Sequence, residues 1–200
     1  MTGISEGLSQ GFTNPALQAQ RVFRHVLEAM ARPGRLHELD DDLPIAPAAL
    51  HEASFAIALA LLDFETPIWL DATLSKASVI EALAFHCGSP MVERSDAASF
   101  GLIGDPKAMP PLSAFNLGPP DYPDRSATLI LQLDGFRGGE ELTLSGPGIQ
   151  GEATVWASGL PDDFQEQWRI NQSGYPNGVD LILTHGRTLA CLPRTTRLGG

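Results

Sequence analysis

The chain has 200 residues, of which 43% are hydrophobic and 18% charged, with a formal net charge of −11. This composition is typical of a folded domain and excludes a disordered chain. The excess of acidic residues disfavours sequence-independent nucleic-acid binding and adhesion to anionic membrane surfaces, because both need a cationic face. The 20 glycines and 16 prolines predict many turns and a loop-rich surface.

The compartment and the domain limits are also predicted from simple features. Two cysteines, Cys87 and Cys191, give no disulfide framework and fit a reducing compartment. The first residues show neither the basic region nor the apolar run of a signal peptide, and no stretch reaches the length of a membrane span. We therefore expect a soluble cytoplasmic protein, with residues 1–14 as a flexible lead and residues 15–197 as a single domain.

The first half of the chain predicts three helices and two short strands. A helix begins at Asn14-Pro15 and ends at Arg32-Pro33-Gly34, since asparagine is a good N-cap and proline cannot continue a helix. Further helices are expected near 48–62, largely buried, and over roughly 75–87, with strands at 66–70 and 99–103. Residues 104–125 contain six prolines and predict a long irregular loop. The apolar face of the first helix is expected to comprise Val22, Phe23, Val26, Leu27 and Met30.

The second half of the chain is richer in strands. Residues 128–133 form a near-continuous apolar run, typical of a central strand that is covered on both faces. We expect 141–145 to be its hairpin mate, across a loop with three glycines, and 162–171 to be helical. A second hairpin is predicted from 179–184 and 188–192. The fold class is therefore α/β, a three-layer α/β/α sandwich with a mixed sheet.

One glycine motif invites a comparison with dinucleotide-binding proteins. Residues 146–151 match the pattern G-x-G-x-x-G and follow a strand, but a dinucleotide site also needs a helix that starts inside the motif. Residues 152–156 are instead β-prone, so the motif favours a tight turn with close backbone packing. Asp63 and Asp180 lie next to apolar runs and are interpreted as turn or hydrogen-bond anchors.

No self-contained catalytic apparatus is evident. The two lysines, Lys76 and Lys107, lie in polar surroundings that would not depress their pKa for Schiff-base chemistry. His86 and Cys87 are adjacent, without further ligands at zinc-finger spacing, so helix-end or core packing is expected for His86; a metal site assembled from distant residues stays open. No nucleophile elbow or Walker sequence occurs. The sequence thus predicts no catalytic residue, no metal and no cofactor.

Two arginines are candidates for binding an anion. Arg194, Thr195 and Thr196 follow the last predicted strand, and a guanidinium with two hydroxyls can bind a phosphate or carboxylate. The alternative is a surface arginine or a subunit contact. Arg32 could also recruit an anion, although an arginine at a helix C-terminus is already favoured by the helix dipole.

Several segments, taken in their order and spacing, resemble the PhnH family, and the resemblance spans about residues 15–197. Each segment alone is weakly specific. The segments are Phe23-Arg24 through Ala29-Met30-Ala31-Arg32-Pro33-Gly34, Leu62-Asp63 through Thr66-Pro67-Ile68-Trp69-Leu70, Phe85-His86 with Ser89-Pro90, 127–133, Leu144-Ser145-Gly146-Pro147-Gly148-Ile149, Tyr175-Pro176, Gly178-Val179-Asp180-Leu181-Ile182-Leu183-Thr184 and Leu192-Pro193-Arg194-Thr195-Thr196.

The resemblance implies a fold similar to pyridoxal-phosphate-dependent transferases, without the cofactor lysine. It also implies a homodimer that joins PhnG, PhnI and PhnJ in the core complex of bacterial carbon–phosphorus lyase. That system converts ATP and a phosphonate such as methylphosphonate into alpha-D-ribose 1-methylphosphonate 5-triphosphate and adenine. Nucleosidase chemistry is then expected on PhnI and radical cleavage of the C–P bond on PhnJ. The family supplies no catalytic residue to carry over to this chain.

Two functional hypotheses follow from the sequence. In the first, the chain is a non-catalytic assembly subunit of the phosphonate-degrading complex. In the second, it binds an anionic ligand, a nucleotide or a phosphonate, and contributes directly to a shared active site through Arg32 and Arg194.

Overall fold

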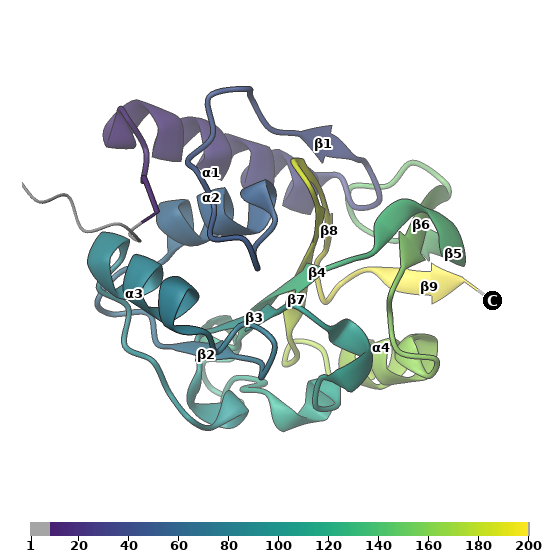
Figure 1. Cartoon of the computed structure of the whole chain (residues 1–200). Coiled ribbons are helices and arrows are strands. Elements are labelled where there is room, and N and C mark those ends of the chain that lie inside the picture. Colours follow the sequence, from purple (N-terminus) through teal and green to yellow (C-terminus); the bar gives the residue numbers. More distant parts are fainter. Residues whose placement is uncertain (1–8, 200) are drawn as a thin grey trace, which may run out of the picture.

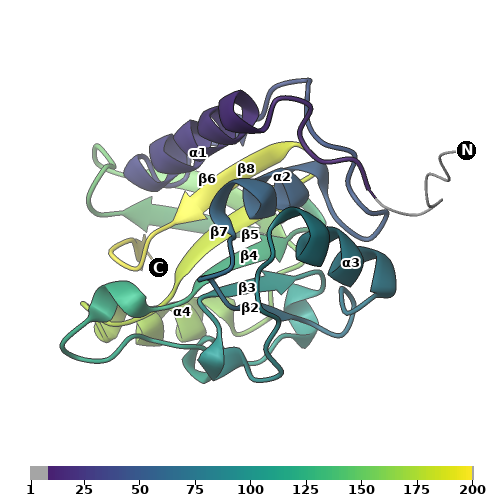
Figure 2. The same cartoon turned by 90° about the vertical axis from the view of Figure 1, so that its left-hand side faces the viewer.

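A six-stranded mixed sheet forms the middle of the molecule, and helices cover both of its faces (Figures 1 and 2). The computed structural model describes residues 9–199. Helices α1 (Pro15–Ala31), α2 (Glu52–Leu61) and α3 (Ala77–His86) lie on one face, and helix α4 (Phe164–Ser173) lies on the other. The predicted α/β class with a mixed sheet is confirmed. No helix in the described part combines the length and apolar character needed to cross a bilayer.

The large sheet has the strand order β1-β8-β7-β4-β3-β2, in which β2, β3, β4 and β7 run parallel and β8 and β1 are antiparallel to their neighbours. A separate three-stranded antiparallel sheet has the order β6-β5-β9 and shares with α4 the side of the large sheet opposite α1–α3. The strands are β1 (His37–Glu38), β2 (Ile68–Leu70), β3 (Phe100–Ile103), β4 (Thr128–Gln132), β5 (Gly135–Ser145), β6 (Ala153–Ser158), β7 (Asp180–His185), β8 (Thr188–Leu192) and β9 (Arg197–Gly199).

The central strands are buried on both faces, as their apolar sequence predicted. On β4, Ile130 packs toward α1–α3, whereas Leu129 and Leu131 pack toward α4 and the small sheet. The same alternation holds on β7, where Ile182 faces the first cluster and its neighbours face the second. Two core clusters therefore share one sheet. Burying one such side chain stabilises the fold by about 1.5–3 kcal/mol.

Helix α1 begins and ends as predicted, but its apolar face is only partly correct. Asn14 accepts a hydrogen bond from the Leu17 amide, and Val22 and Val26 are buried against the core. The side chains of Phe23 and Leu27, which were expected on that face, are 44% and 51% exposed. The helix packs through a narrower stripe, because the residues that reach its neighbours α2 and β8 are spaced strictly three and four apart.

The predicted hairpin between 128–133 and 141–145 is wrong. Strand β4 has β3 on one edge and β7 on the other, both parallel to it, so it offers no free edge to an antiparallel mate. The chain instead leaves the large sheet after β4, and β5 pairs with β6 and β9. The expected glycine loop lies inside β5, where the pairing register with β6 shifts between Gly135 and Glu140.

The remaining elements follow the sequence closely. Strands β7 and β8 form the predicted hairpin across 185–187, and residues 104–127 contain three short 3-10 turns in place of regular strands or longer helices. Of the expected flexible lead, residues 1–8 lie outside the described residues. The following segment is held by hydrogen bonds, because the carbonyl of Ser9 is 2.8 Å from Nε2 of His86 and that of Gln10 accepts from the Ile45 amide at 3.1 Å.

Close packing explains why the turn after β5 is rich in glycine. Gly148 has φ +82°, and a Cβ placed there would lie 2.1 Å from the carbonyl oxygen of Ala31 at the end of α1. Close packing of backbone on backbone therefore requires glycine here. The segment that follows is strand β6 and not a helix, which confirms the interpretation as a tight turn and not a dinucleotide site.

We expect Gly148→Ala to destabilise the protein by roughly 3 kcal/mol or more, because it adds a backbone clash to the left-handed strain. Gly151→Ala is the matched control: its φ is +76°, but no atom lies within 4 Å of the added Cβ, so the strain alone should cost about 1–2 kcal/mol. Urea unfolding of both variants measures the difference. Equal losses of stability would show that the contact with α1 is unimportant.

Candidate functional site

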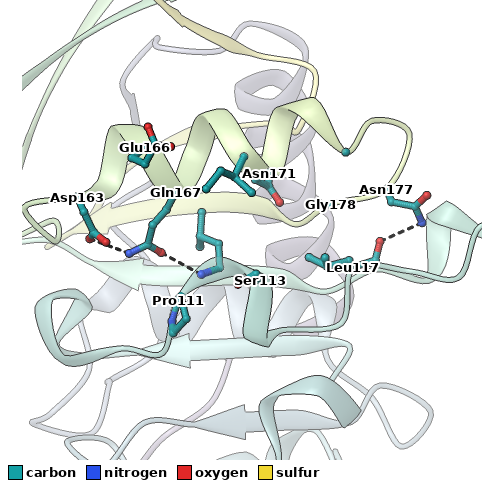
Figure 3. A pocket seen from close by; sticks show the side chains of 12 residues that line it. Pro111, Ser113, Leu117, Asp163, Glu166, Gln167, Asn171, Asn177 and Gly178 are labelled. Atoms are coloured by element: carbon teal, nitrogen blue, oxygen red, sulfur yellow. Dashed lines mark hydrogen bonds between the residues drawn. The ribbon is translucent and has the colours of Figure 1, made fainter.

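A mainly apolar hollow lies between α4 and the irregular segment 111–118 (Figure 3). Its volume is about 260 Å³, and apolar atoms make up most of its lining. Twelve residues line it: Pro111, Leu112, Ser113, Leu117, Asp163, Glu166, Gln167, Ile170, Asn171, Gly174, Asn177 and Gly178. A pocket of this kind, apolar with a few polar groups at its edge, is the usual form of a small binding site.

Side-chain amides fix the walls of this hollow. Gln167 accepts a hydrogen bond from the Leu112 amide (2.9 Å) and donates one to the Asp163 carboxylate (2.8 Å), so it ties the loop to α4. On the far side, Asn177 donates to the carbonyl of Gly118 at 2.7 Å. Because both walls are held by directed hydrogen bonds, the shape of the hollow is preformed.

The charge of the hollow determines what it can accept. Asp163 and Glu166 are its charged residues, both acidic, and no lysine, arginine or histidine is in its lining. Glu166 is paired with Arg169, which is not part of the lining. The lining therefore offers an anion no cationic partner, whereas an apolar side chain would be accommodated. The hollow is therefore unsuited to a free phosphonate or nucleotide, and the predicted anion-binding residues lie elsewhere.

Arg194 is held by partners within the chain. Its Nε donates to Oδ1 of Asp180 at 3.1 Å, its Nη2 donates to Oδ2, and its Nη1 donates to the carbonyl of Pro123 at 2.8 Å. The Arg194 backbone amide also donates to Asp180, at 2.7 Å. The two side chains are only 14% and 21% exposed. This bidentate pair joins the start of β7 to the end of β8 and to the loop before β4.

The two threonines that follow have structural surroundings. The carbonyl of Thr196 accepts a hydrogen bond from the indole of Trp168 at 2.9 Å. The backbone amide of Thr196 donates to the carbonyl of Pro193. The Thr196 hydroxyl is buried and finds no partner in the described part of the chain. Thr195 is half-buried, and its carbonyl lies beside Gly146. Both residues therefore help to hold the last turn against α4 and the glycine turn.

Arg32 lies in a different hollow, of about 390 Å³, which it shares with Arg35 and the segment 148–153. Arg194 does not line this hollow. The structure thus brings Arg32 together with Arg35, a residue that the sequence reasoning missed, and not with the predicted Arg194–Thr196 group. The signal that could have found it is a second arginine just past the Pro-Gly exit of α1.

Acidic side chains anchor three connections. The interpretation of Asp63 and Asp180 is confirmed: Asp63 accepts from the Glu65 amide at 2.9 Å, and Asp180 holds Arg194. Asp71 was missed, although it follows strand β2 directly. Its buried carboxylate accepts from the amides of Gly104 (3.0 Å) and Asp105 (2.9 Å) and so joins the ends of β2 and β3.

The histidines have packing roles. His86 ends α3 and contacts Phe55 edge-on at 6.2 Å, which confirms the expected helix-end and core position. The rings of His51 and His185 lie 5.3 Å apart at the carboxyl ends of β4 and β7. Burial lowers the pKa of His51, and the neighbouring His185 lowers it further. Within residues 9–199, no three His, Cys, Asp or Glu side chains are grouped as a metal site would need.

Exposure and burial determine the reactivity of the two lysines and the two cysteines. Lys76 and Lys107 are exposed, in agreement with their polar sequence surroundings. Burial raises the pKa of Cys87 to about 12, and it raises the pKa of the fully buried Cys191 as well. Both thiols are therefore protonated at neutral pH and are poor nucleophiles.

We expect Arg194→Ala to lower the free energy of unfolding by about 2–4 kcal/mol, because it leaves the half-buried Asp180 carboxylate without its guanidinium partner. Arg94→Ala is the control, since it breaks an ion pair whose arginine is 77% exposed, and it should produce no measurable change. Denaturant unfolding gives both values. If Arg194→Ala were as stable as the unmodified protein, the pair with Asp180 would not be needed for folding. The Arg194 guanidinium of the unmodified protein would then be available for a ligand.

The His51 environment gives a pH dependence with a defined sign. Because its folded pKa lies below the ordinary value of 6.5, protons bind the unfolded chain more readily. His51 therefore stabilises the fold fully above 6.5, and this contribution is lost as the pH falls from 6.5 toward the folded pKa. We expect the decline in unfolding free energy between about pH 7.5 and 5.5 to be smaller in His51→Gln. Identical declines in the two proteins would contradict the assignment.

Comparisons with known proteins agree with the segments recognised in the sequence. Residues 10–199 match the family described as bacterial phosphonate metabolism protein (PhnH). A Rhizobium meliloti (strain 1021) protein, alpha-D-ribose 1-methylphosphonate 5-triphosphate synthase subunit PhnH, is 40% identical over 198 residues, covering 99% of this chain and 98% of the relative. A Stutzerimonas stutzeri protein, putative C-P lyase subunit protein HtxG, is 30% identical over 186 residues, covering 92% of this chain and 87% of the relative. The chain therefore belongs to the PhnH family.

Proposed function

We propose that the protein is a subunit of a carbon–phosphorus lyase core complex in phosphonate breakdown. With homologues of PhnG, PhnI and PhnJ, it would support formation of alpha-D-ribose 1-methylphosphonate 5-triphosphate from ATP and methylphosphonate. The observation that carries this proposal is the 40% identity, over nearly the whole of both chains, to a protein named as a subunit of that synthase. Similarity over the full length favours the same place in the same kind of assembly.

Within that complex we favour an assembly role over a catalytic one. The most suggestive anion ligand in the sequence, Arg194, has its guanidinium bonded to Asp180 and to the Pro123 carbonyl. Releasing it for a substrate would leave a partly buried carboxylate unpaired, which is unfavourable. The apolar hollow beside α4 has no basic residue in its lining and so suits a protein side chain better than a phosphonate.

The second candidate is an anion-binding subunit that contributes to a shared active site. The observation in its favour is the hollow that contains Arg32 and Arg35, two cationic side chains in a chain of net charge −11. Glycine backbone in the turn 146–151 borders the same hollow. A nucleotide or phosphonate could be held there by the two guanidinium groups, and a partner subunit would supply the reacting residues.

The finer expectations from the resemblance also stand as parts of the proposal. They are a cytoplasmic homodimer, a single unit over residues 15–197, and a fold related to pyridoxal-phosphate-dependent transferases without the cofactor. The shared use of one large sheet by both core clusters supports a single unit. The exposed positions of Lys76 and Lys107 support a protein that does not use a pyridoxal Schiff base.

Co-purification tests membership in the complex. We expect the tagged protein to retain the PhnG, PhnI and PhnJ homologues of its native host, identified by mass spectrometry. Absence of all three under conditions in which the phosphonate genes are expressed would remove the proposal.

The reconstituted complex separates the two roles. The double substitution Arg32→Ala, Arg35→Ala empties the second hollow of its cations, and Arg24→Ala removes an exposed arginine from α1 as the matched control. An assembly role predicts that synthesis of the ribose triphosphate product is unchanged in both. Loss of turnover in the double variant alone, with the complex intact by size-exclusion chromatography, would establish the anion-binding role. Calorimetry with millimolar ATP or methylphosphonate on the isolated protein gives an independent answer.

A further inference from the structure

The apolar hollow beside α4 follows the helix along its length (Figure 3). The lining residues from α4 and from the two ends of that helix lie three and four positions apart, at 163, 166, 167, 170, 171 and 174, so they share one face. The core contacts of α4 are made from an adjoining face, through the fully buried side chains of Phe164 and Trp168. The hollow is therefore separate from the packing that holds the helix in place.

The polar side chains of the lining are already engaged within the chain. Asn171 uses both ends of its amide on one residue, since it donates to the Val179 carbonyl at 2.9 Å and accepts from the Val179 amide at 2.8 Å. The lining side chains with partners of this kind are Asp163, Glu166, Gln167, Asn171 and Asn177. Apart from the exposed Ser113 and two glycines, the remaining lining residues are apolar: Pro111, Leu112, Leu117 and Ile170.

Backbone contacts hold the hollow open at one end. The Gly178 amide donates to the Leu117 carbonyl at 3.0 Å, and a Cβ at Gly178 would lie 2.9 Å from Oδ1 of Asn171. Protein interiors are otherwise close-packed, and atoms that line an empty apolar space lose dispersion contacts. Water replaces these contacts poorly, because a bound water needs several polar partners and the polar groups nearby are engaged. A ligand that fills the hollow would therefore supply contacts that the free protein lacks.

Volume and charge together define the class of ligand. The hollow measures about 260 Å³, and an apolar cavity of about 150 Å³ is enough to take up benzene, so one ring or two fused rings would fit. The lining offers no cation, and its two carboxylates are engaged by Gln167 and Arg169. A charged ligand would lose its hydration in this hollow without gaining a partner of opposite charge.

The rim favours a free molecule over the side chain of another protein. Glu166 lines the hollow and pairs with Arg169, and their side chains are 52% and 70% exposed. A protein surface placed over the hollow would take this pair out of water, and removing an ion pair from water is costly. A molecule that lies inside the hollow leaves the pair hydrated.

We propose that the hollow beside α4 binds a small uncharged compound of one or two rings. The site is distinct from the hollow that contains Arg32 and Arg35, and it does not depend on either role considered for the protein within the complex. A ligand there contacts both α4 and the segment 111–118, which Gln167 already joins through the Leu112 amide. Binding therefore reduces the opening of this segment away from the helix.

Indole and two charged derivatives test the chemical class of the ligand. We expect indole to bind the isolated protein with a dissociation constant below about 1 mM. Indole-3-acetate and tryptamine carry a negative and a positive charge on the same ring system, and each should bind at least about tenfold more weakly. A titration followed by NMR of the backbone amides gives all three constants, and the signals of 112–118 and 163–178 should shift. No binding of indole, equal binding of a charged derivative, or shifts confined to other residues would overturn the proposal.

Ile170→Glu tests the location of the site. Ile170 lines the hollow and is 56% exposed, so the change puts a carboxylate into the apolar lining without disturbing the core, and the dissociation constant for indole should rise about tenfold or more. Gln172→Glu is the matched control, because it adds the same charge to α4 outside the lining and should leave the constant unchanged. Ser113→Trp, at another exposed lining position, obstructs the hollow by bulk and should also weaken binding. Urea midpoints identify the folded variants, and unchanged indole binding in a folded Ile170→Glu or Ser113→Trp protein would contradict the assignment.

Hydrogen exchange and the assembled complex distinguish a ligand site from a subunit contact. Bound indole should slow the exchange of the amides of 112–118 in the isolated protein. A complex obtained by co-purification should bind indole with the same dissociation constant, and loss of binding there would show that a partner subunit covers the hollow, which would refute the proposal. Failure of the partners to co-purify would count against membership in the complex and would leave the result on the isolated protein as it stands.

Discussion

Burial of β4 and β7 on both faces is the constraint on which the rest of the structure depends. Each strand alternates its side chains between the cluster beneath α1–α3 and the cluster beneath α4, so neither cluster can form without the other's sheet face. Because both edges of β4 are also occupied by parallel strands, the chain that follows must leave the large sheet. The separate three-stranded sheet results from that exclusion.

The Arg194–Asp180 pair joins this central sheet to the irregular part of the fold. Asp180 begins β7, Arg194 follows β8, and the same guanidinium reaches the Pro123 carbonyl in the loop before β4. A bidentate pair fixes orientation as well as distance, so it can hold a proline-rich loop that has little regular structure of its own. An arginine beside hydroxyl groups at a strand end thus has a sufficient structural explanation. The other arginine that the sequence singled out, Arg32, lies beside the glycine turn.

Local patterns predicted the elements well and their partners less well. The N-cap at Asn14, the buried run of β4 and the β7–β8 hairpin depend on neighbours in sequence, and all were predicted. The strand partner of β5 depends on which edges are free after the large sheet forms, a property of the whole fold that no local pattern carries. The exposure of Phe23 arises in the same way, since helical spacing shows which residues share a face but not how wide a face the neighbouring helix covers. Arg194 was predicted as a candidate from its chemistry, but only the structure shows that Asp180, 14 residues earlier, already holds it.

An assembly subunit needs surfaces that specify geometry as well as adhesion. Exposed apolar side chains such as Phe64, Phe85 and Leu27 are scattered over several elements, and isolated exposed apolar residues are common on soluble proteins. Apolar contact is also non-directional, so it does not by itself determine how two chains are oriented. The backbone groups of an open strand, in contrast, accept a partner only at a defined spacing and direction.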